Sequence, residues 1–228
     1  MINTLRRNIK KQDSLVSKLL YRIVKFVKHG QLPSLTILYK PIYICYKLMG
    51  IIFHRCMNLF IYIPMMQSRL TQYANGLQLE NGMPLIAGPV SISIGNNTCL
   101  NGAMSIHGHP DNEQCELVIG NDCHIGWQTG ITVGTKVIIG NNVMIAGRTM
   151  ISGHSGHGVS IDERDNPKMA DLVIEDNVWL CTNCHIVRPV HIGRGSVIAA
   201  GCIVTKDVPE NVLFGGNPGK IIRYLNSE

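Results

Sequence analysis

Three histidines in two irregular segments are the residues best suited to acid–base chemistry. His154 and His157 lie three residues apart in the segment SGHSGHG (residues 152–158), and His109 lies in the earlier segment HGHP. An imidazole titrates near neutral pH, so the rings of His157 and His154 are candidate general bases. Three carboxylates follow in the same segment, and any of them could orient such a base, as could a backbone carbonyl: Asp162, Glu163 and Asp165.

A second cluster, Cys181, Cys184 and His185, matches the C-x-x-C-H pattern of haem attachment. Both cysteines, however, stand one and four positions after Leu180, where the repeat described below requires small residues. No second cysteine pair stands at a spacing typical of a zinc site. The eight cysteines also show no disulfide framework. We therefore expect neither haem nor a metal site, and a reducing compartment.

Three further histidines, His124, His185 and His191, each precede an inward position of the repeat and are expected to face solvent. We therefore do not expect them to converge on a metal ion.

The elements that position these residues are predicted by a six-residue period. Aliphatic residues recur six apart in one long run and three shorter ones: Ile174, Leu180, Ile186, Ile192, Ile198 and Val204; Ile119, Ile125 and Ile131; Ile139, Ile145 and Ile151; Ile94, Leu100 and Ile106. Six fits neither the 3.6-residue helical period nor a simple strand. It fits one short strand and one turn per six residues, with three such units in a triangular coil. These positions predict a mainly β fold, a parallel β-helix of about five coils.

Two interruptions of this period indicate where a site lies. Residues 107–116 leave the repeat after Ile106, and residues 152–171 leave it after Ile151. Both exits fall at the third face of a coil, two coils apart, so the two loops start from the same corner. Insertions in solenoids often form the binding face. The sequence therefore predicts that the histidine-bearing loops line one groove.

The N-terminal third differs in charge from the rest of the chain. Residues 1–70 contain 12 Lys and Arg but one acid, Asp13 (12 − 1 = +11), whereas residues 71–228 contain 9 basic and 14 acidic residues (9 − 14 = −5). We therefore predict two domains, a basic amphipathic helical extension over residues 1–75 and the β-helix over residues 76–228, with a short C-terminal helix after the last coil.

Residues 35–66 are strongly apolar, but basic side chains at positions 40, 47, 54 and 55 interrupt them. No uncharged run approaches the roughly 20 residues of a membrane span. We predict two or three short helices, divided at Pro33, Pro41 and Pro64, that lie in a membrane interface. The alternative is that they pack on the main domain. The first 18 residues are polar and basic, unlike a signal peptide, so we expect a cytoplasmic protein at the inner face of the cytoplasmic membrane.

Several segments between residues 90 and 224 resemble the hexapeptide-repeat O-acetyltransferases, in the branch related to galactoside, maltose and capsule or lipopolysaccharide acetyltransferases. The most specific segments are the histidine loop before NP, the VW pair, AAGCIVTKDVP and GGNPGKIIR. The resemblance implies a left-handed β-helix, a homotrimer, acetyl-CoA as cosubstrate without a bound cofactor, and a sugar or glycan acceptor. It implies no nucleic-acid partner.

The resemblance also implies roles for individual residues. His157 matches the general base, with His154 as its rival in the same loop. The residues matched to acetyl-CoA binding are Trp179, Thr182, Ala200, Thr205, Lys206, Lys220 and Arg223. The residues expected to contact the acceptor are His109, Trp127 and His154. The alternatives are ordinary ones: a packing role for Trp179, and a solvated C-terminal segment for Lys220 and Arg223.

Together these features predict transfer of acetyl from acetyl-CoA to a hydroxyl of a cell-surface polysaccharide sugar, as in a capsule or O-antigen. The acidic and amide residues that hold a galactoside in this family have no clear counterpart near residues 127–134. Two alternatives stay open, N-acetylation of a nucleotide-linked amino sugar and a β-helix scaffold without catalysis.

Overall fold

A computed structural model describes residues 14–29, 35–154 and 170–225. The chain divides into two compact units, residues 1–51 and residues 52–228. Helix α2 (Leu15–His29) belongs to the first unit, and α3 (Thr36–Met57) runs from the first unit into the second. It continues directly into the π-helical turn η1 (Asn58–Tyr62) and the short helix α4 (Ile63–Gln67).

Residues 36–67 form one continuous helical run of 32 residues, so the predicted breaks at Pro41 and Pro64 are wrong. Pro41 lies in the second turn of α3, where it removes one hydrogen bond while apolar residues on both sides continue the helix. Pro64 follows η1, in which Ile63 N–H donates to the Asn58 carbonyl five residues back. This wider turn accommodates the proline ring.

Within the described residues, this run is the one helix long and apolar enough to cross a membrane, and none of its apolar window is buried.

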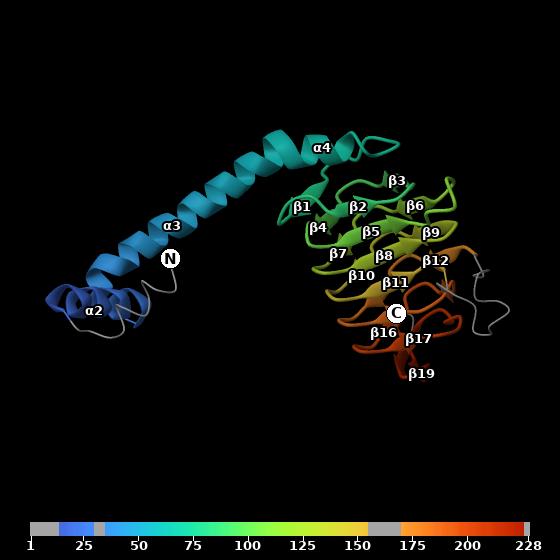
Figure 1. Cartoon of the computed structure of the whole chain (residues 1–228). Helices are drawn as coiled ribbons and strands as arrows, with labels where there is room; N and C mark the ends of the chain where they lie inside the picture. Colours follow the sequence, from blue (N-terminus) through green and yellow to red (C-terminus); the bar gives the residue numbers. More distant parts are fainter. Residues whose placement is uncertain (1–13, 30–34, 155–169, 226–228) are drawn as a thin grey trace. The chain divides into compact units, whose positions relative to one another are not determined.

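The second unit contains three sheets whose strands are parallel, apart from the last strand of one sheet, and which wind around one axis (Figure 1). Sheet A contains β3 (Ser91–Ile94), β6 (Glu116–Ile119), β9 (Lys136–Ile139), β12 (Leu172–Ile174) and β15 (His191–Ile192). Sheet B contains β1 (Gln78–Glu80), β4 (Cys99–Asn101), β7 (His124–Ile125), β10 (Met144–Ile145), β13 (Trp179–Leu180), β16 (Val197–Ile198), β18 (Val212–Gly216) and β19 (Gly219–Tyr224). Sheet C contains β2 (Leu85–Ala87), β5 (Ser105–Gly108), β8 (Gly130–Val133), β11 (Met150–Ser152), β14 (His185–Ile186) and β17 (Ile203–Val204). The chain passes through sheets B, C and A in turn, so each group of three strands is one coil.

The six-residue period correctly identifies the core. All fifteen predicted inward residues have side chains no more than 1% exposed. They stack in register, as where Ile151 of β11 pairs with Ile131 of β8 and Ile186 of β14. Each coil thus covers the aliphatic side chains of the next, which is the main stabilising contribution in a solenoid.

Sheet C has six strands, so the helix has six coils, where the repeat predicted about five. The additional coil is the first, β1 to β3, which pairs with the second through β4, β5 and β6. Its core residues Leu79 and Ile86 are seven positions apart, and this breaks the six-residue period that identified the other coils.

Asparagine side chains shape the corner between sheets A and B. Asn97, Asn142 and Asn177 adopt left-handed backbone conformations there, with φ of 56°, 52° and 58°. Asparagine tolerates this region better than most residues. The residue before each turn also forms a ladder between coils, as where Asn141 Oδ1 accepts from Asn121 N–H at 2.9 Å.

The C-terminal segment forms a β-hairpin, so the predicted C-terminal helix is wrong. β18 pairs in parallel with β16 and antiparallel with β19. Phe214 of β18 is buried, and its ring leaves no room for a side chain at Gly219. The turn residues and the β-branched Ile221 and Ile222 favour strands over a helix.

Candidate active site

The two loops that interrupt the repeat start from the same corner, as predicted. β5 and β11 lie on either side of β8 in sheet C, so the chain leaves the coil at equivalent points two coils apart. This corner joins sheet C to sheet A, and we call it the C–A corner. In the intervening coil, Gly134 and Thr135 alone connect β8 to β9.

The C–A corner brings His109 and His154 together. Their ring centroids are 5.1 Å apart and the rings are nearly perpendicular, at 89°. Gly134 lies between the loops: a Cβ there would be 2.6 Å from the Gly153 carbonyl oxygen and 2.9 Å from the His154 Cβ. Asn112 Nδ2 donates to the Gly134 carbonyl at 2.8 Å and ties the first loop to the same turn.

The surroundings of His109 set its tautomer. The Asp111 backbone N–H donates to His109 Nδ1 at 3.3 Å, so Nε2 of the neutral ring carries the proton. The His109 ring is half-buried, and its Nε2–H is a donor that an acceptor molecule could use. His154, also half-buried, is the last described residue before the second loop.

The predicted base His157 lies outside the described residues, as do its candidate partners Asp162, Glu163 and Asp165. The described part of this site therefore consists of His109, His154 and the glycine turn between them.

Trp127 does not join these histidines within one chain. It precedes β8 at the corner between sheets B and C, the B–C corner, at the opposite end of the sheet C strands. Arg148, from the next coil, lies over its ring at 5.3 Å from the centroid. A cation over an indole is attracted to the ring and restricts its orientation. Sequence reasoning missed Arg148, although the repeat aligns it with the residue after Trp127.

The residues predicted to bind acetyl-CoA fall into three groups. Thr182 and Ala200 are exposed on successive coils of the B–C corner, where Gly201 N–H donates to the Thr182 carbonyl at 3.0 Å. Thr205 and Lys206 follow β17 at the C–A corner.

The third group lies on sheet B. Trp179 projects from its outer face, 47% exposed, between Met144 and Val197. Lys220 and Arg223 lie on β19, both exposed. The two corner groups lie at opposite ends of the sheet C strands, so one chain does not gather all of these residues at one point.

The thiols near this surface are poor nucleophiles. Cys184 is fully buried, and its Sγ donates to the Cys181 carbonyl at 2.9 Å. Burial raises the pKa of Cys184 to about 12, and burial also raises the pKa of Cys181. Both occupy the repeat positions that the spacing predicted for them. The haem-like motif is thus accounted for by packing.

His124, His185 and His191 lie on sheets B, C and A, so they do not converge. In the part of the chain that the structure describes, no group of three His, Cys, Asp or Glu side chains could hold a metal ion.

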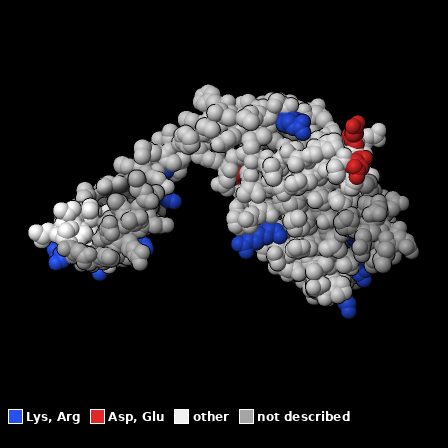
Figure 2. Space-filling model, viewed as in Figure 1, with Lys and Arg blue, Asp and Glu red and all other residues white. Residues whose placement is uncertain are grey.

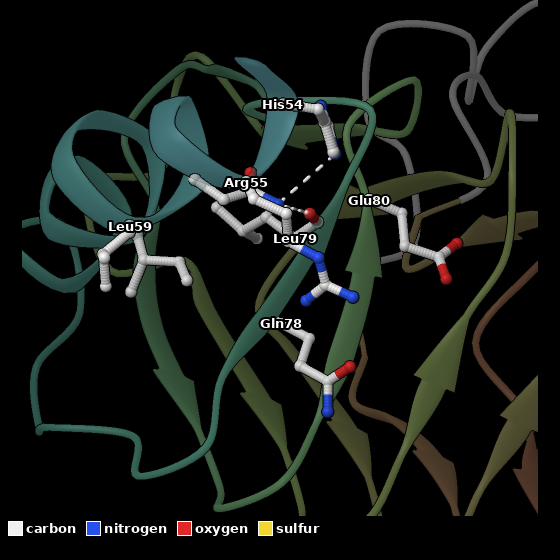
Figure 3. A pocket seen from close by; sticks show the side chains of 8 residues that line it. His54, Arg55, Leu59, Gln78, Leu79 and Glu80 are labelled. Carbon is white, nitrogen blue, oxygen red and sulfur yellow. Dashed lines mark hydrogen bonds between the residues drawn. The ribbon is translucent and has the colours of Figure 1, made fainter. Parts of the chain in front are cut away.

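A hollow of about 480 Å³ lies between the helical run and the first coil (Figure 3). It is lined by His54, Arg55, Asn58, Leu59, Ile63, Gln78, Leu79 and Glu80. Asn58 Nδ2 donates to the Leu79 carbonyl at 2.6 Å, while Asn58 Oδ1 is buried without a partner among the described residues. The sequence offered no signal for this hollow, because it precedes the regular repeat.

Two segments of the repeat match known protein families. Residues 171–206 match the family described as bacterial transferase hexapeptide (six repeats), and residues 116–146 match the hexapeptide repeat of succinyl-transferase.

Proteins named as acetyltransferases are similar to part of this chain. The chain is 39% identical over 82 residues to galactoside O-acetyltransferase of Lactococcus lactis (31% of this chain, 40% of that protein). It is 43% identical over 74 residues to galactoside O-acetyltransferase of Escherichia coli (32% and 36%). It is also 42% identical over 62 residues to 2,3,4,5-tetrahydropyridine-2,6-dicarboxylate N-acetyltransferase of Clostridium perfringens (27% and 26%). In each case the match spans less than half of the relative's length.

Solved structures share the fold over a larger part of the chain. AntD, an N-acyltransferase from Bacillus cereus, aligns with a TM-score of 0.60 at 19% identity, covering 72% of this chain and 88% of that one. The hexapeptide-repeat acetyltransferase VCA0836 from Vibrio cholerae aligns with a TM-score of 0.50 at 24% identity, covering 71% and 77%. Such neighbours are left-handed β-helices, which confirms the predicted fold class. The chain thus contains two segments of hexapeptide repeat, shares the fold of these structures and is similar over part of its length to hexapeptide-repeat acetyltransferases.

Proposed function

We propose that this protein is an O-acetyltransferase that moves the acetyl group of acetyl-CoA to a hydroxyl of a cell-surface glycan. The observation that carries the proposal is the C–A corner, where His109 and His154 meet at the start of the loop that contains His157. The chain is similar over about a third of its length to enzymes named galactoside O-acetyltransferases.

The proposed reaction needs one base. A neutral loop imidazole takes the proton of the sugar hydroxyl as its oxygen attacks the thioester carbonyl. The C–O bond forms, the carbonyl oxygen becomes an oxyanion, and donors such as backbone N–H groups stabilise it. The C–S bond then breaks, and the imidazolium returns its proton to the departing thiolate of CoA. No metal or redox group is required.

His157 is the proposed base, on the resemblance of its loop. His154 is the second candidate, and a specific observation favours testing it equally. Its ring contacts the ring of His109, which presents a protonated Nε2 at the same corner. His109 would then hold the acceptor by a hydrogen bond.

The proposed assembly is a homotrimer with acetyl-CoA bound between copies. Large apolar side chains stand exposed along the coils of sheets B and C: Trp127, Met144, Met150 and Trp179. Contact between copies would cover them and would bring the B–C corner of one copy close to the C–A corner of another. AntD, which shares the fold, has been solved with coenzyme A.

N-acetylation of a nucleotide-linked amino sugar is the alternative reaction. The relative from Clostridium perfringens is an N-acetyltransferase, and AntD has been solved with dTDP-4-amino-4,6-dideoxyglucose. An amine acceptor would use the same base and cosubstrate, so the acceptor panel below separates the two. A scaffold without catalysis would turn over no acceptor.

The proposed location is the inner face of the cytoplasmic membrane, with contact through residues 1–66. No acidic residue occurs between Asp13 and Glu80. The apolar side chains of α3 are exposed along its length, including Ile37 and Ile52. Packing of these helices on another protein surface is the alternative.

The test is acetyl transfer by the purified full chain, followed as free thiol release with acetyl-CoA and a panel of glycans and amino sugars. The variants are His157→Ala and His154→Ala, with His124→Ala as the matched control on sheet B. Loss of the base should lower kcat by about a hundredfold or more, and the control should keep full activity. Undiminished turnover in both loop variants would refute the mechanism.

A further inference from the structure

Helix α2 divides into two halves of opposite character. At 100° per residue, its aliphatic and aromatic residues other than Tyr21 occupy one half of the helix surface: Leu15, Val16, Leu19, Leu20, Ile23, Val24, Phe26 and Val27. Its polar residues and Tyr21 occupy the other: Ser17, Lys18, Tyr21, Arg22, Lys25, Lys28 and His29. No residue of α2 is buried, and Leu19 and Phe26 are 60% and 59% exposed. The apolar half is therefore uncovered.

The polar half carries positive charge only. Its four Lys and Arg residues stand three or four positions apart, and the helix contains no acid. Figure 2 shows basic and no acidic side chains on the visible face of this helix. Lys28 and His29 in the last turn suit the negative end of the helix dipole.

Two serines, Ser14 and Ser17, cap the N-terminus of α2. Ser14 Oγ accepts from Ser17 N–H at 3.1 Å, and Ser17 Oγ is 3.0 Å from Ser14 N–H, so each serine satisfies a backbone donor of the other. The start of α2 is thus fixed by residues of its own first turn.

Length and pattern distinguish α2 from α3. At 1.5 Å per residue, α2 is about 22 Å long, which is too short for a hydrocarbon core of about 30 Å. In α3, Lys40, Lys47 and His54 recur every seven residues and form a narrow stripe, and Arg55 in the last turn is the one further basic residue of a mostly apolar helix. Of these two helices, only α2 has a polar half along which Lys and Arg side chains are distributed from the first turns to the last.

A surface that accepts α2 must offer apolar contact and negative charge side by side. The headgroup region of an anionic bilayer offers both over the whole length of the helix, since acyl chains lie a few ångströms below the phosphates. An acidic protein surface would neutralise the basic half but leave the eight apolar side chains uncovered.

We propose that α2 lies in the plane of the membrane interface and binds anionic phospholipid, with the apolar half among the acyl chains and the basic half among the phosphates. This inference rests on the proposed membrane contact of residues 1–66 and names the helix and the lipid class responsible. Lys18, Arg22, Lys25 and Lys28 make the contact selective for negative charge.

The test is vesicle co-sedimentation of the full chain, with vesicles of phosphatidylcholine alone or mixed with phosphatidylglycerol. The charge variant is Lys18→Gln with Lys25→Gln. Its matched control is Arg188→Gln with Arg194→Gln, which removes two exposed positive charges from the β-helix. A third variant, Ile23→Glu, disrupts the apolar half.

The wild-type chain should prefer mixed vesicles, and raised salt should weaken this preference. The charge variant should bind mixed vesicles about 30-fold more weakly, while the control binds like wild type. Ile23→Glu should weaken binding to both kinds of vesicle. Equal binding to both kinds by the wild-type chain would overturn the lipid class and leave the proposed membrane contact standing. A full preference for mixed vesicles in the charge variant would overturn the role of α2. Absence of binding to either would overturn both proposals, but not acetyl transfer.

Discussion

His109 and His154 pack edge to face at the C–A corner, with ring centroids 5.1 Å apart, although each belongs to a different interruption of the repeat. The contact exists because β5 and β11 lie two coils apart in sheet C and because Gly134 lets the loops approach. The two segments lie outside the six-residue repeat, and they are brought together by strands that follow the repeat.

Replacement of His109 by phenylalanine tests its proposed hydrogen bond to the acceptor. His109→Phe keeps an aromatic ring against His154 but removes the Nε2–H donor. We expect kcat/KM for the acceptor to fall about tenfold, the equivalent of one hydrogen bond. The melting temperature should change little, since the 3.3 Å contact from Asp111 N–H to Nδ1 is the one structural hydrogen bond lost among the described residues. Steady-state kinetics beside His124→Ala measure the fall in kcat/KM. An unaltered kcat/KM would exclude His109 from acceptor binding.

An added methyl group at Gly134 tests the geometry of the corner. Gly134→Ala would drive a Cβ against the Gly153 carbonyl and the His154 Cβ. We expect the free energy of unfolding to fall by about 1–3 kcal/mol, and acetyl transfer to fall with it because His154 is displaced. Urea denaturation measures the first effect. Gly50→Ala is the control, because nothing lies within 4 Å of its added methyl group and alanine favours a helix. Equal stability of the two variants would contradict the close approach of the loops.

Burial of Cys184 predicts both its reactivity and a pH dependence. Because its pKa is raised from 9.0 to about 12, the folded state favours the neutral thiol. This contribution to stability is fully present below pH 9 and is lost as the pH rises toward 12. At pH 8 we expect iodoacetamide to modify the exposed Cys45 and Cys56 but to reach Cys184 only after unfolding. Mass spectrometry of alkylated peptides checks this. Cys184 labelling at the rate of Cys45 in the native protein would contradict the packing of this coil.

The junction of the helical run with the first coil depends on Asn58. Its Nδ2 donates to the Leu79 carbonyl at 2.6 Å, while its buried Oδ1 lacks a partner among the described residues. Asn58→Ala removes this hydrogen bond, the longer contact of Nδ2 with His54 Nε2 at 3.3 Å, and the unsatisfied oxygen together. The expected loss is therefore modest, about 1 kcal/mol in the free energy of unfolding. Thermal unfolding beside the exposed Gln78→Ala variant measures it, and a loss no larger than that of Gln78→Ala would show that this bond contributes nothing.

The repeat was predictable from the sequence because a solenoid converts spacing along the chain into contact in space. Residues such as Ile131, Ile151 and Ile186 stack on one another because each coil has three equal units. The period therefore identified fifteen inward positions, all of which are buried, as well as the outward histidines and the corner from which both loops leave.

Other features had no period to reveal them. The first coil has a seven-residue step from Leu79 to Ile86. The run from Thr36 to Gln67 continues through Pro41 within α3 and through Pro64 after a π-helical turn. The C-terminal residues pair as a hairpin because β18 continues sheet B and buries Phe214. Only the tertiary structure decided these outcomes.

The candidate site shows the same division. Residue types and loop positions indicated histidine chemistry at one corner. That His109 meets His154, while Trp127 lies at the other end of β8 beneath Arg148, followed only from the folded chain. Contacts between aperiodic loops depend on side-chain directions and on the room left by residues such as Gly134. The spacing of residues along the chain predicts neither of these, whereas it does predict the coil from which the loops leave.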